Sequence, residues 1–185
     1  NYGWEHPAYF DADQPDTPGF TRQGWWESVG REARMLREAG GIIDISNFAK
    51  YRVTGPGAEA WLDALLANRM PRRVGRSCLT PLIGKRGGIA GDFTVTRPGA
   101  EEFWAIGSGM AERYHARFFG AVPVPDGTSC ESMTTAMCGF NVAGPRAREM
   151  LSRLTNASLA TQDWPFMGSG WIDLAGVRVL ALRVS

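Results

Sequence analysis

The sequence repeats one pattern, in which a β-type segment is followed by a Gly-Pro pair and an amphipathic helical segment. The two copies are residues 53–62 (VTGPGAEAWL) and 142–151 (VAGPRAREML). Proline in a first turn favours the start of a helix, and the glycine before it marks the turn. Two strand–helix units with hairpin-like strands between them predict an α+β fold built from duplicated halves. The alternation is too irregular for a doubly wound sheet, and no G-x-G-x-x-G fingerprint occurs between a strand and a helix.

Hydrophobic periodicity and turn residues divide the chain into expected elements. We expect helices over 25–37, 56–66 and 110–119, and strands over 41–47, 51–54, 77–83, 92–97, 103–107 and 177–185. We also expect residues 1–40 to form an aromatic N-terminal arm and helix, and residues 41–185 to form one domain. The arm, which we expect to lie against another surface, carries Tyr2, Trp4, Tyr9 and Phe10. The last strand has no cap after it, so we expect the chain to be a piece of a longer protein.

The bulk composition excludes several classes of partner. Hydrophobic residues make up 44% and charged residues 21%, as in ordinary soluble domains. A net charge of +1 argues against duplex DNA or an anionic membrane as the main partner. No run of about 18 apolar residues predicts a membrane span. The chain has an odd number of cysteines, Cys78, Cys130 and Cys138, and their spacing is not that of metal ligands. We therefore expect reduced thiols that pack as small apolar residues, in a cytosolic-type compartment.

Asp92 is the first candidate for acid–base chemistry. It follows a glycine-rich stretch, residues 87–91, which we expect to form a turn that brings the carboxylate to the start of a strand. Phe93, Val95 and Ile89 look buried, so the carboxylate lies near the edge of a core. There its pKa could be shifted, or it could hold a cationic nitrogen. The alternative is an Asp that merely caps a turn.

Three further features admit both a functional and a structural interpretation. The polar residues of 44–47 could bind a heteroaromatic ligand, or could simply shape a turn. The backbone amides of residues 107–109 could face an anion, although such glycine turns also serve packing. We expect His115 to be a surface or packing residue rather than a metal ligand, because its spacing to other ligand types is wrong.

Five segments, taken in order, resemble the folate-binding aminomethyltransferase superfamily, whose best-known member is the glycine-cleavage T-protein. They are residues 43–50, 53–56, 67–69, 87–92 and 181–185. Their order and spacing are more specific than any one segment. Within the superfamily, residues 45–50 and 91–97 look more like the C-terminal tetrahydrofolate part of dimethylglycine and sarcosine dehydrogenases.

The resemblance implies a ferredoxin-like folate-binding domain with an antiparallel sheet, incomplete at its C-terminus. It implies that the domain captures an iminium from N-methyl amine oxidation as 5,10-methylene-tetrahydrofolate. The implied partners are tetrahydrofolate, a methylated amine and an FAD oxidoreductase domain or subunit outside this chain. Asp92 takes the position of the catalytic carboxylate, and Asn47, Leu79, Ser108 and Arg183 become candidate folate contacts. The implied location is cytoplasmic, or the mitochondrial matrix in a eukaryote.

The chain departs from the T-protein pattern at several positions. T-proteins usually carry Tyr where this chain has Leu79, Asn where it has Gly84, and a folate-contacting Asn near Ser108. The strand that ends at Ser185 normally runs on into a Gly-Glu-Gly segment that grips the pterin. We therefore expect this chain by itself to be inactive.

Two other functions stay open at the level of sequence. The same scaffold could demethylate a sulfonium or another methyl donor with tetrahydrofolate as acceptor. The domain could also be a non-catalytic interaction module that docks through the aromatic residues of 1–24.

Overall fold

The computed structural model describes residues 7, 9–11, 13 and 18–185, and Tyr2 and Trp4 of the expected arm lie outside these residues. The chain forms two compact units. One comprises the described residues up to Ile43 together with Val142–Met150, and the other comprises Asp44–Asn141 and Leu151–Ser185. The domain boundary expected between residues 40 and 41 stays a prediction.

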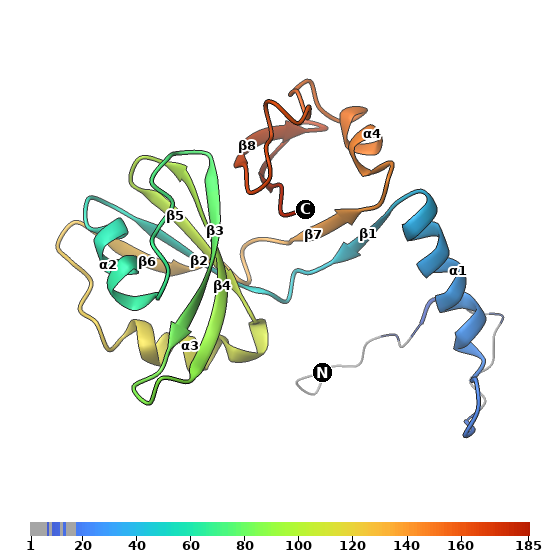
Figure 1. The fold of residues 1–185 in the computed structure, drawn as a ribbon, viewed down its shortest axis with the longest axis horizontal. Coiled ribbons are helices and arrows are strands. Elements are labelled where there is room, and N and C mark those ends of the chain that lie inside the picture. The colour runs from blue at the N-terminus through green and yellow to red at the C-terminus, as the bar shows by residue number, and fades with distance from the viewer. Residues whose placement is uncertain (1–6, 8, 12, 14–17) are drawn as a thin grey trace. The chain divides into compact units, whose positions relative to one another are not determined.

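The larger unit is built on a five-stranded sheet in the order β3-β4-β5-β2-β6 (Figure 1). Its strands are β2 (Ala49–Thr54), β3 (Arg76–Ile83), β4 (Ile89–Gly99), β5 (Glu102–Gly107) and β6 (Ser129–Ser132). Every neighbouring pair is antiparallel. A second hairpin pairs β8 (Ser169–Leu174) with β9 (Val177–Leu182). The predicted mixed fold with antiparallel sheets is confirmed.

The repeated Gly-Pro pattern has the same local structure in both places. In the first copy β2 leads through Gly55 into α2 (Ala58–Leu65), and in the second β7 (Phe140–Ala143) leads through Gly144 into α4 (Ala147–Ser152). The two glycines have φ of 112° and 111°, a region that a residue with a Cβ rarely adopts. The remaining elements are α1 (Trp25–Glu38), β1 (Gly41–Asp44), which pairs with β7, and α3 (Glu112–Phe119), which follows a 3-10 turn over Gly109–Ala111.

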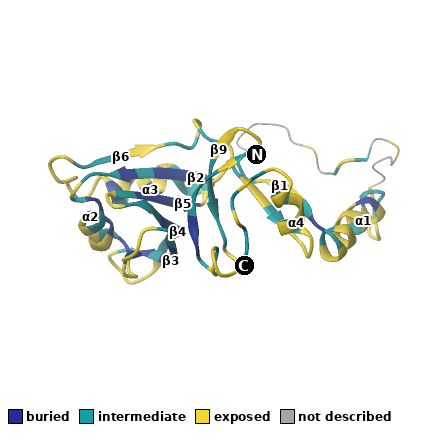
Figure 2. Ribbon diagram, turned by 90° about the horizontal axis from the view of Figure 1, so that it is seen from above, coloured by how far each residue is buried: buried dark blue, intermediate teal, exposed yellow. Residues whose placement is uncertain are grey.

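An aromatic cluster joins the helices α2 and α3 to one face of the sheet. The ring of Phe119 in α3 lies 4.8 Å from Tyr51 of β2, 5.8 Å from Phe93 of β4 and 5.9 Å from Trp61 of α2. All four side chains are buried. Figure 2 shows that buried residues, in dark blue, gather on strands of the five-stranded sheet. Edge and tilted contacts of this kind add to the free energy gained from burying apolar area. The core of the larger unit therefore lies between the sheet and these two helices.

The start of β4 differs from the expectation. The strand begins at Ile89 rather than at Asp92, because its ladder with β3 continues through Gly91, with an irregularity at Leu82 and Ile83. The tight turn lies earlier, where the amide of Gly84 donates to the carbonyl of Gly88. Ile89, expected to be buried, is 74% exposed because it lies beside this turn. Asp92 is consequently a residue within a strand.

Replacing Phe119 by Ala tests the importance of the aromatic cluster. We expect the free energy of unfolding to fall by about 3–5 kcal/mol, because the change leaves a cavity between three rings. Chemical denaturation followed by tryptophan fluorescence measures this loss. Ile89→Ala is the control and should change stability by less than about 0.5 kcal/mol. Equal losses in both variants would contradict the assignment of the core.

Candidate functional site

The face of the sheet opposite α2 and α3 carries the polar residues of β4. Phe93 and Val95 point into the core, so Asp92, Thr94 and Thr96 point to the other face, because side chains alternate along a strand. Residues that pair across strands share a face. The register therefore identifies which residues of the neighbouring strands accompany Asp92.

One end of this second face is closed by β8. The hydroxyl of Thr96 donates to the hydroxyl of Ser169, and the rings of Trp104 and Trp171 lie 6.0 Å apart. Thr96 and Trp104 are consequently buried. β8 thus covers this end of the face around Thr96 and Trp104.

The other end of the same face is open, and Asp92 lies there. Asp92 pairs with Pro81 of β3, which makes Leu79 its diagonal neighbour at about 7–8 Å. On the other side Phe93 pairs with Gly107, so Ser108 follows β5 next to Asp92. Asp92 and Ser108 are exposed, and the Leu79 side chain is 64% exposed. The structure thus brings three of the five predicted site residues together.

Asn47 approaches the same end through the segment before β2. Ala49 pairs with Gly107, so residues 47 and 48 run alongside Ser108 and Gly109. A Cβ on Gly109 would lie 1.6 Å from the carbonyl oxygen of Asn47, so only glycine permits this approach. The close approach of the two backbones therefore accounts for the glycine at position 109, and no bound anion is needed to explain it. The side chain of Asn47 has no hydrogen-bond partner among the described residues and is exposed.

A buried lysine fixes the segment that carries Asn47. The Nζ of Lys50 donates to the carbonyls of Ser46 and Phe48 at 2.9 Å each, on the two sides of Asn47. Lys50 is only 6% exposed, and this burial lowers its pKa, although Asp44, among other neighbours, acts in the opposite direction. Nothing in the sequence indicates this role, because a lysine in a strand is ordinarily a solvated residue.

Asp44 and Ser46 shape a turn, in agreement with the structural interpretation of residues 44–47. The amide of Ser46 donates to the Asp44 carboxylate at 2.7 Å, and the amide of Gly139 donates to the Ser46 hydroxyl at 3.1 Å. Hydrogen bonds from the Ser46 hydroxyl and amide lower the pKa of Asp44. Both side chains are therefore occupied within the turn.

Arg183 lies just after β9 and is held by its own surroundings. Its guanidinium donates to the carbonyls of Trp164 and Ser185, and its backbone pairs with Met167 and Gly168. None of these contacts involves Asp92, Ser108 or Asn47. Its role as a folate contact stays a prediction.

His115 in α3 is packed behind Asp92, on the core side of β4. It is fully buried, its ring lies 4.7 Å from that of Phe93, and neither ring nitrogen has a hydrogen-bond partner in the described structure. A Cβ on Gly91 would lie 2.6 Å from its Nε2, which is why β4 carries glycine there. Burial lowers the pKa of His115, and the nearby Asp92 and Glu112 raise it by less. His115 is thus a neutral packing residue, one of the two structural roles expected for it.

The described residues include no arrangement of three or more His, Cys, Asp or Glu side chains suited to a metal ion. Within the same residues, no helix is both long and apolar enough to cross a membrane. The three cysteines are free thiols. The site around Asp92 is therefore a carboxylate with exposed apolar and hydrogen-bonding neighbours on an open sheet face.

The larger unit is an α+β domain that exposes a carboxylate on one face of its antiparallel sheet. Two solved structures share the fold of this chain. An aminomethyltransferase T of the glycine cleavage system from Bartonella henselae aligns with TM-score 0.68 and 21% identity, over 78% of this chain and 40% of that one. A heterotetrameric sarcosine oxidase from Corynebacterium sp. U-96 aligns with TM-score 0.65 and 15% identity, over 90% and 83% of the respective chains.

The sequence profile of the GCVT N-terminal domain family matches residues 1–185, and the chain belongs to this family. Mitochondrial dimethylglycine dehydrogenase of Rattus norvegicus is 30% identical over 99% of this chain. The regulatory subunit of mitochondrial pyruvate dehydrogenase phosphatase from Mus musculus is 28% identical over 98% of it. The chain spans 22% of the length of each of these relatives.

Replacing Lys50 by Met tests the anchoring of the Asn47 segment. The variant leaves the carbonyls of Ser46 and Phe48 without their charged donor, so we expect a loss of about 1.5–3 kcal/mol in the free energy of unfolding. Amide hydrogen exchange of residues 46–48 should accelerate. Lys85→Met is the matched control, since Lys85 is exposed in the hairpin turn and is the only other lysine of the sequence. A similar loss in both variants would contradict the anchoring role.

The pH dependence of stability tests the burial of His115. Its pKa is lowered in the folded protein, so above about pH 7 the residue is neutral in both the folded and unfolded states. As the pH falls through about 6.5, the unfolded chain takes up a proton first and stability declines. Between about pH 7.5 and 5.5 this contribution reaches at most about 1.4 kcal/mol. Denaturation of His115→Phe at both pH values should show a correspondingly smaller decline, and an unchanged decline would contradict the assignment.

Proposed function

We propose that this chain is a tetrahydrofolate-dependent one-carbon transfer domain of the aminomethyltransferase type. In this proposal it captures the iminium that forms when an N-methyl amine such as dimethylglycine or sarcosine is oxidised, and yields 5,10-methylene-tetrahydrofolate. The observation that carries the proposal is Asp92, an exposed carboxylate at the open end of the sheet face, in a chain that belongs to the GCVT N-terminal domain family. The similarity to dimethylglycine dehydrogenase supports the choice of amine.

The neighbours of Asp92 suit a flat heteroaromatic ring such as a pterin. Leu79 offers exposed apolar area, and Asn47 and Ser108 supply amide and hydroxyl groups that can both donate and accept. We assign these three residues to folate binding, and Arg183 is a more distant candidate. A ferredoxin-like arrangement and an origin by duplication are part of the same proposal.

Asp92 has two tasks in the proposed reaction. When bound, tetrahydrofolate supplies the nucleophilic nitrogen that bonds to the methylene carbon. Asp92 stabilises the positive charge of the iminium before this bond forms, because a preplaced carboxylate needs no reorganisation during the reaction. The carboxylate then accepts the proton that the attacking nitrogen loses and returns it to the amine nitrogen. The amine thereby leaves as its bond to the methylene carbon breaks, and that carbon bonds to the second folate nitrogen, whose proton passes to solvent. The protein needs no Ser or Cys nucleophile of its own for this chemistry.

The oxidation step belongs to a different domain or subunit in this proposal. Conversion of an N-methyl group into an iminium removes two electrons and a proton, which FAD in that domain takes up. The sarcosine oxidase from Corynebacterium sp. U-96 is a heterotetramer, which is consistent with a separate oxidising subunit. We infer a soluble protein of the cytoplasm or the mitochondrial matrix. The rat relative is named as mitochondrial.

A second surface is needed to complete the site. Asp92 lies on an open face and lines neither of two cavities of the larger unit, one bordered by Ser77 and Pro165 and the other by Ile89 and Phe118. A reactive iminium must be kept from bulk water. We therefore propose that the larger unit alone is inactive, and that another domain covers the face that carries Asp92.

A non-catalytic role is the second candidate, and a specific relative favours it. The regulatory subunit of pyruvate dehydrogenase phosphatase carries a region similar to almost all of this chain. In such a module the open face would bind a protein or effector without turnover. Demethylation of a sulfonium donor by the same carboxylate is a third candidate on this scaffold.

Replacing Asp92 by Asn tests the proposed function in the protein at its full natural length. We expect the rate of 5,10-methylene-tetrahydrofolate formation to fall by about 10²–10³-fold, because the variant keeps the shape of the side chain and loses its charge. Amine oxidation, followed by flavin reduction, should continue. Glu101→Gln is the control, since Glu101 is an exposed carboxylate at the opposite end of β4.

The folate product that forms and the binding of reduced folate distinguish the three candidate functions. Formation of 5-methyl-tetrahydrofolate from a sulfonium donor would overturn the proposal in favour of demethylation. Absence of reduced-folate binding by calorimetry, with unchanged turnover in Asp92→Asn, would establish the non-catalytic module instead.

A further inference from the structure

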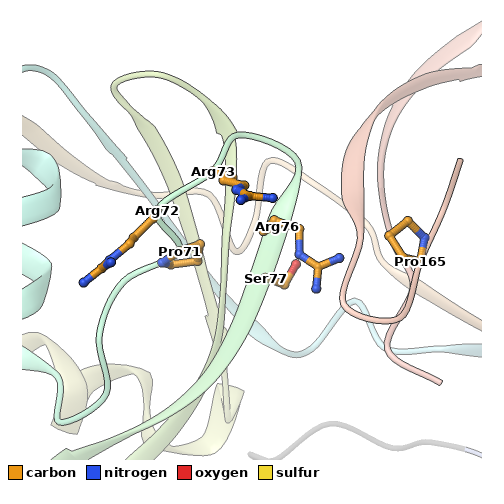
Figure 3. Close-up of a pocket in the computed structure, with 6 residues that line it drawn as sticks. All are labelled: Pro71, Arg72, Arg73, Arg76, Ser77 and Pro165. Atoms are coloured by element: carbon orange, nitrogen blue, oxygen red, sulfur yellow. The ribbon is translucent and has the colours of Figure 1, made fainter. Parts of the chain in front are cut away.

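We propose that the larger unit contains a second binding site, for a small oxyanion, formed by Arg73, Arg76 and Ser77. These residues border an open cavity of about 680 Å³ at the start of β3 (Figure 3). The site lies outside the group of residues around Asp92. Its ligand class is a phosphate or carboxylate group carried by a small molecule.

The cavity gathers three arginine side chains at the start of β3. Its lining comprises Pro71, Arg72, Arg73, Arg76, Ser77 and Pro165. Among the described residues, none of the three arginines forms an ion pair. The nearby Arg97 differs, because its guanidinium bonds to Glu59 at 2.7 Å and to the carbonyl of Pro71. Within the described residues, the three guanidinium groups that border the cavity thus have no carboxylate partner.

Ser77 supplies an independent observation that indicates a ligand. It is 9% exposed, and its Oγ has no hydrogen-bond partner within the described residues. Buried hydroxyls ordinarily find a partner, and one without a partner calls for an explanation. Its amide is already occupied by the carbonyl of Met167, which holds the residue in place. An oxyanion in the cavity would accept the hydrogen bond that the Ser77 hydroxyl can donate.

The directions of the side chains select which arginines take part. In Figure 3 the guanidinium groups of Arg73 and Arg76 extend toward the side of Pro165, whereas that of Arg72 extends the opposite way. A guanidinium donates two parallel hydrogen bonds to a carboxylate or phosphate, which a lysine cannot match. Pro71 and Pro165 have no amide hydrogen, so their backbones cannot donate a hydrogen bond to the ligand. Arg73, Arg76 and Ser77 are therefore the donors.

The oxyanion site and Asp92 are far enough apart for independent occupancy. Ser77 and Pro81 lie four residues apart on β3, which corresponds to about 13 Å, and Pro81 pairs with Asp92. At this distance ions in solution largely screen the repulsion between Asp92 and a bound anion. The inference consequently does not rest on the proposed folate chemistry.

Titration calorimetry at constant ionic strength tests the site with two probes, inorganic phosphate and succinate. We expect saturable binding of at least one probe, and the probe that binds more tightly distinguishes phosphate from carboxylate ligands. Arg76→Gln and Arg73→Gln should each weaken binding by about tenfold or more. Arg76→Lys should have an intermediate effect, and Ser77→Ala should weaken binding several-fold.

Arg72→Gln is the matched control, because it removes the same charge from the same loop on a side chain that extends away. Its affinity should stay within about twofold of the wild type. Two results would overturn the proposal: no saturable binding of either probe, or an equal loss in Arg72→Gln and Arg76→Gln, which would indicate diffuse attraction. Unchanged unfolding midpoints in the variants establish that losses of affinity do not come from misfolding.

Discussion

The alternation of side chains along β4 is the constraint on which the rest of the larger unit depends. Phe93 and Val95 fill the core beneath α2 and α3, and this forces Asp92, Thr94 and Thr96 onto the other face. A shift of the register by one residue would bury the Asp92 carboxylate and expose the two apolar residues. The aromatic packing that stabilises the fold therefore also fixes where the proposed catalytic group can lie.

The sequence was sufficient to predict the mixed fold, because its signals were local. Glycine–proline pairs and alternating apolar residues predicted α2, β3 and β5 within a few residues of their bounds. The polar strand β6 (Ser129–Ser132) was missed because it lacks apolar alternation and pairs only with β2 at the sheet edge. The start of β4 was placed late, since glycines suggested a turn where the ladder to β3 continues.

The candidate site could be predicted only in part, because its support comes from residues distant in sequence. Resemblance to a family indicated Asp92, Leu79, Ser108 and Asn47, and the register of the four strands β2 to β5 accounts for their shared location. The anchoring by Lys50 depends on two carbonyls whose position follows from the fold. The burial of His115 likewise depends on the closeness of β4, which Gly91 permits.

The two ends of the second sheet face differ because β8 covers only one of them. Where β8 packs, Thr96 and Ser169 satisfy each other and the face contributes to stability. Ser77, which pairs with Thr96 in this covered region, is buried yet unsatisfied, and beyond the region Asp92 is exposed. A hydroxyl without a partner beside unpaired arginines favours an anion, whereas an exposed carboxylate favours a cation. One sheet face can thus hold ligands of opposite charge, provided that they bind at separate positions along β3 and β4.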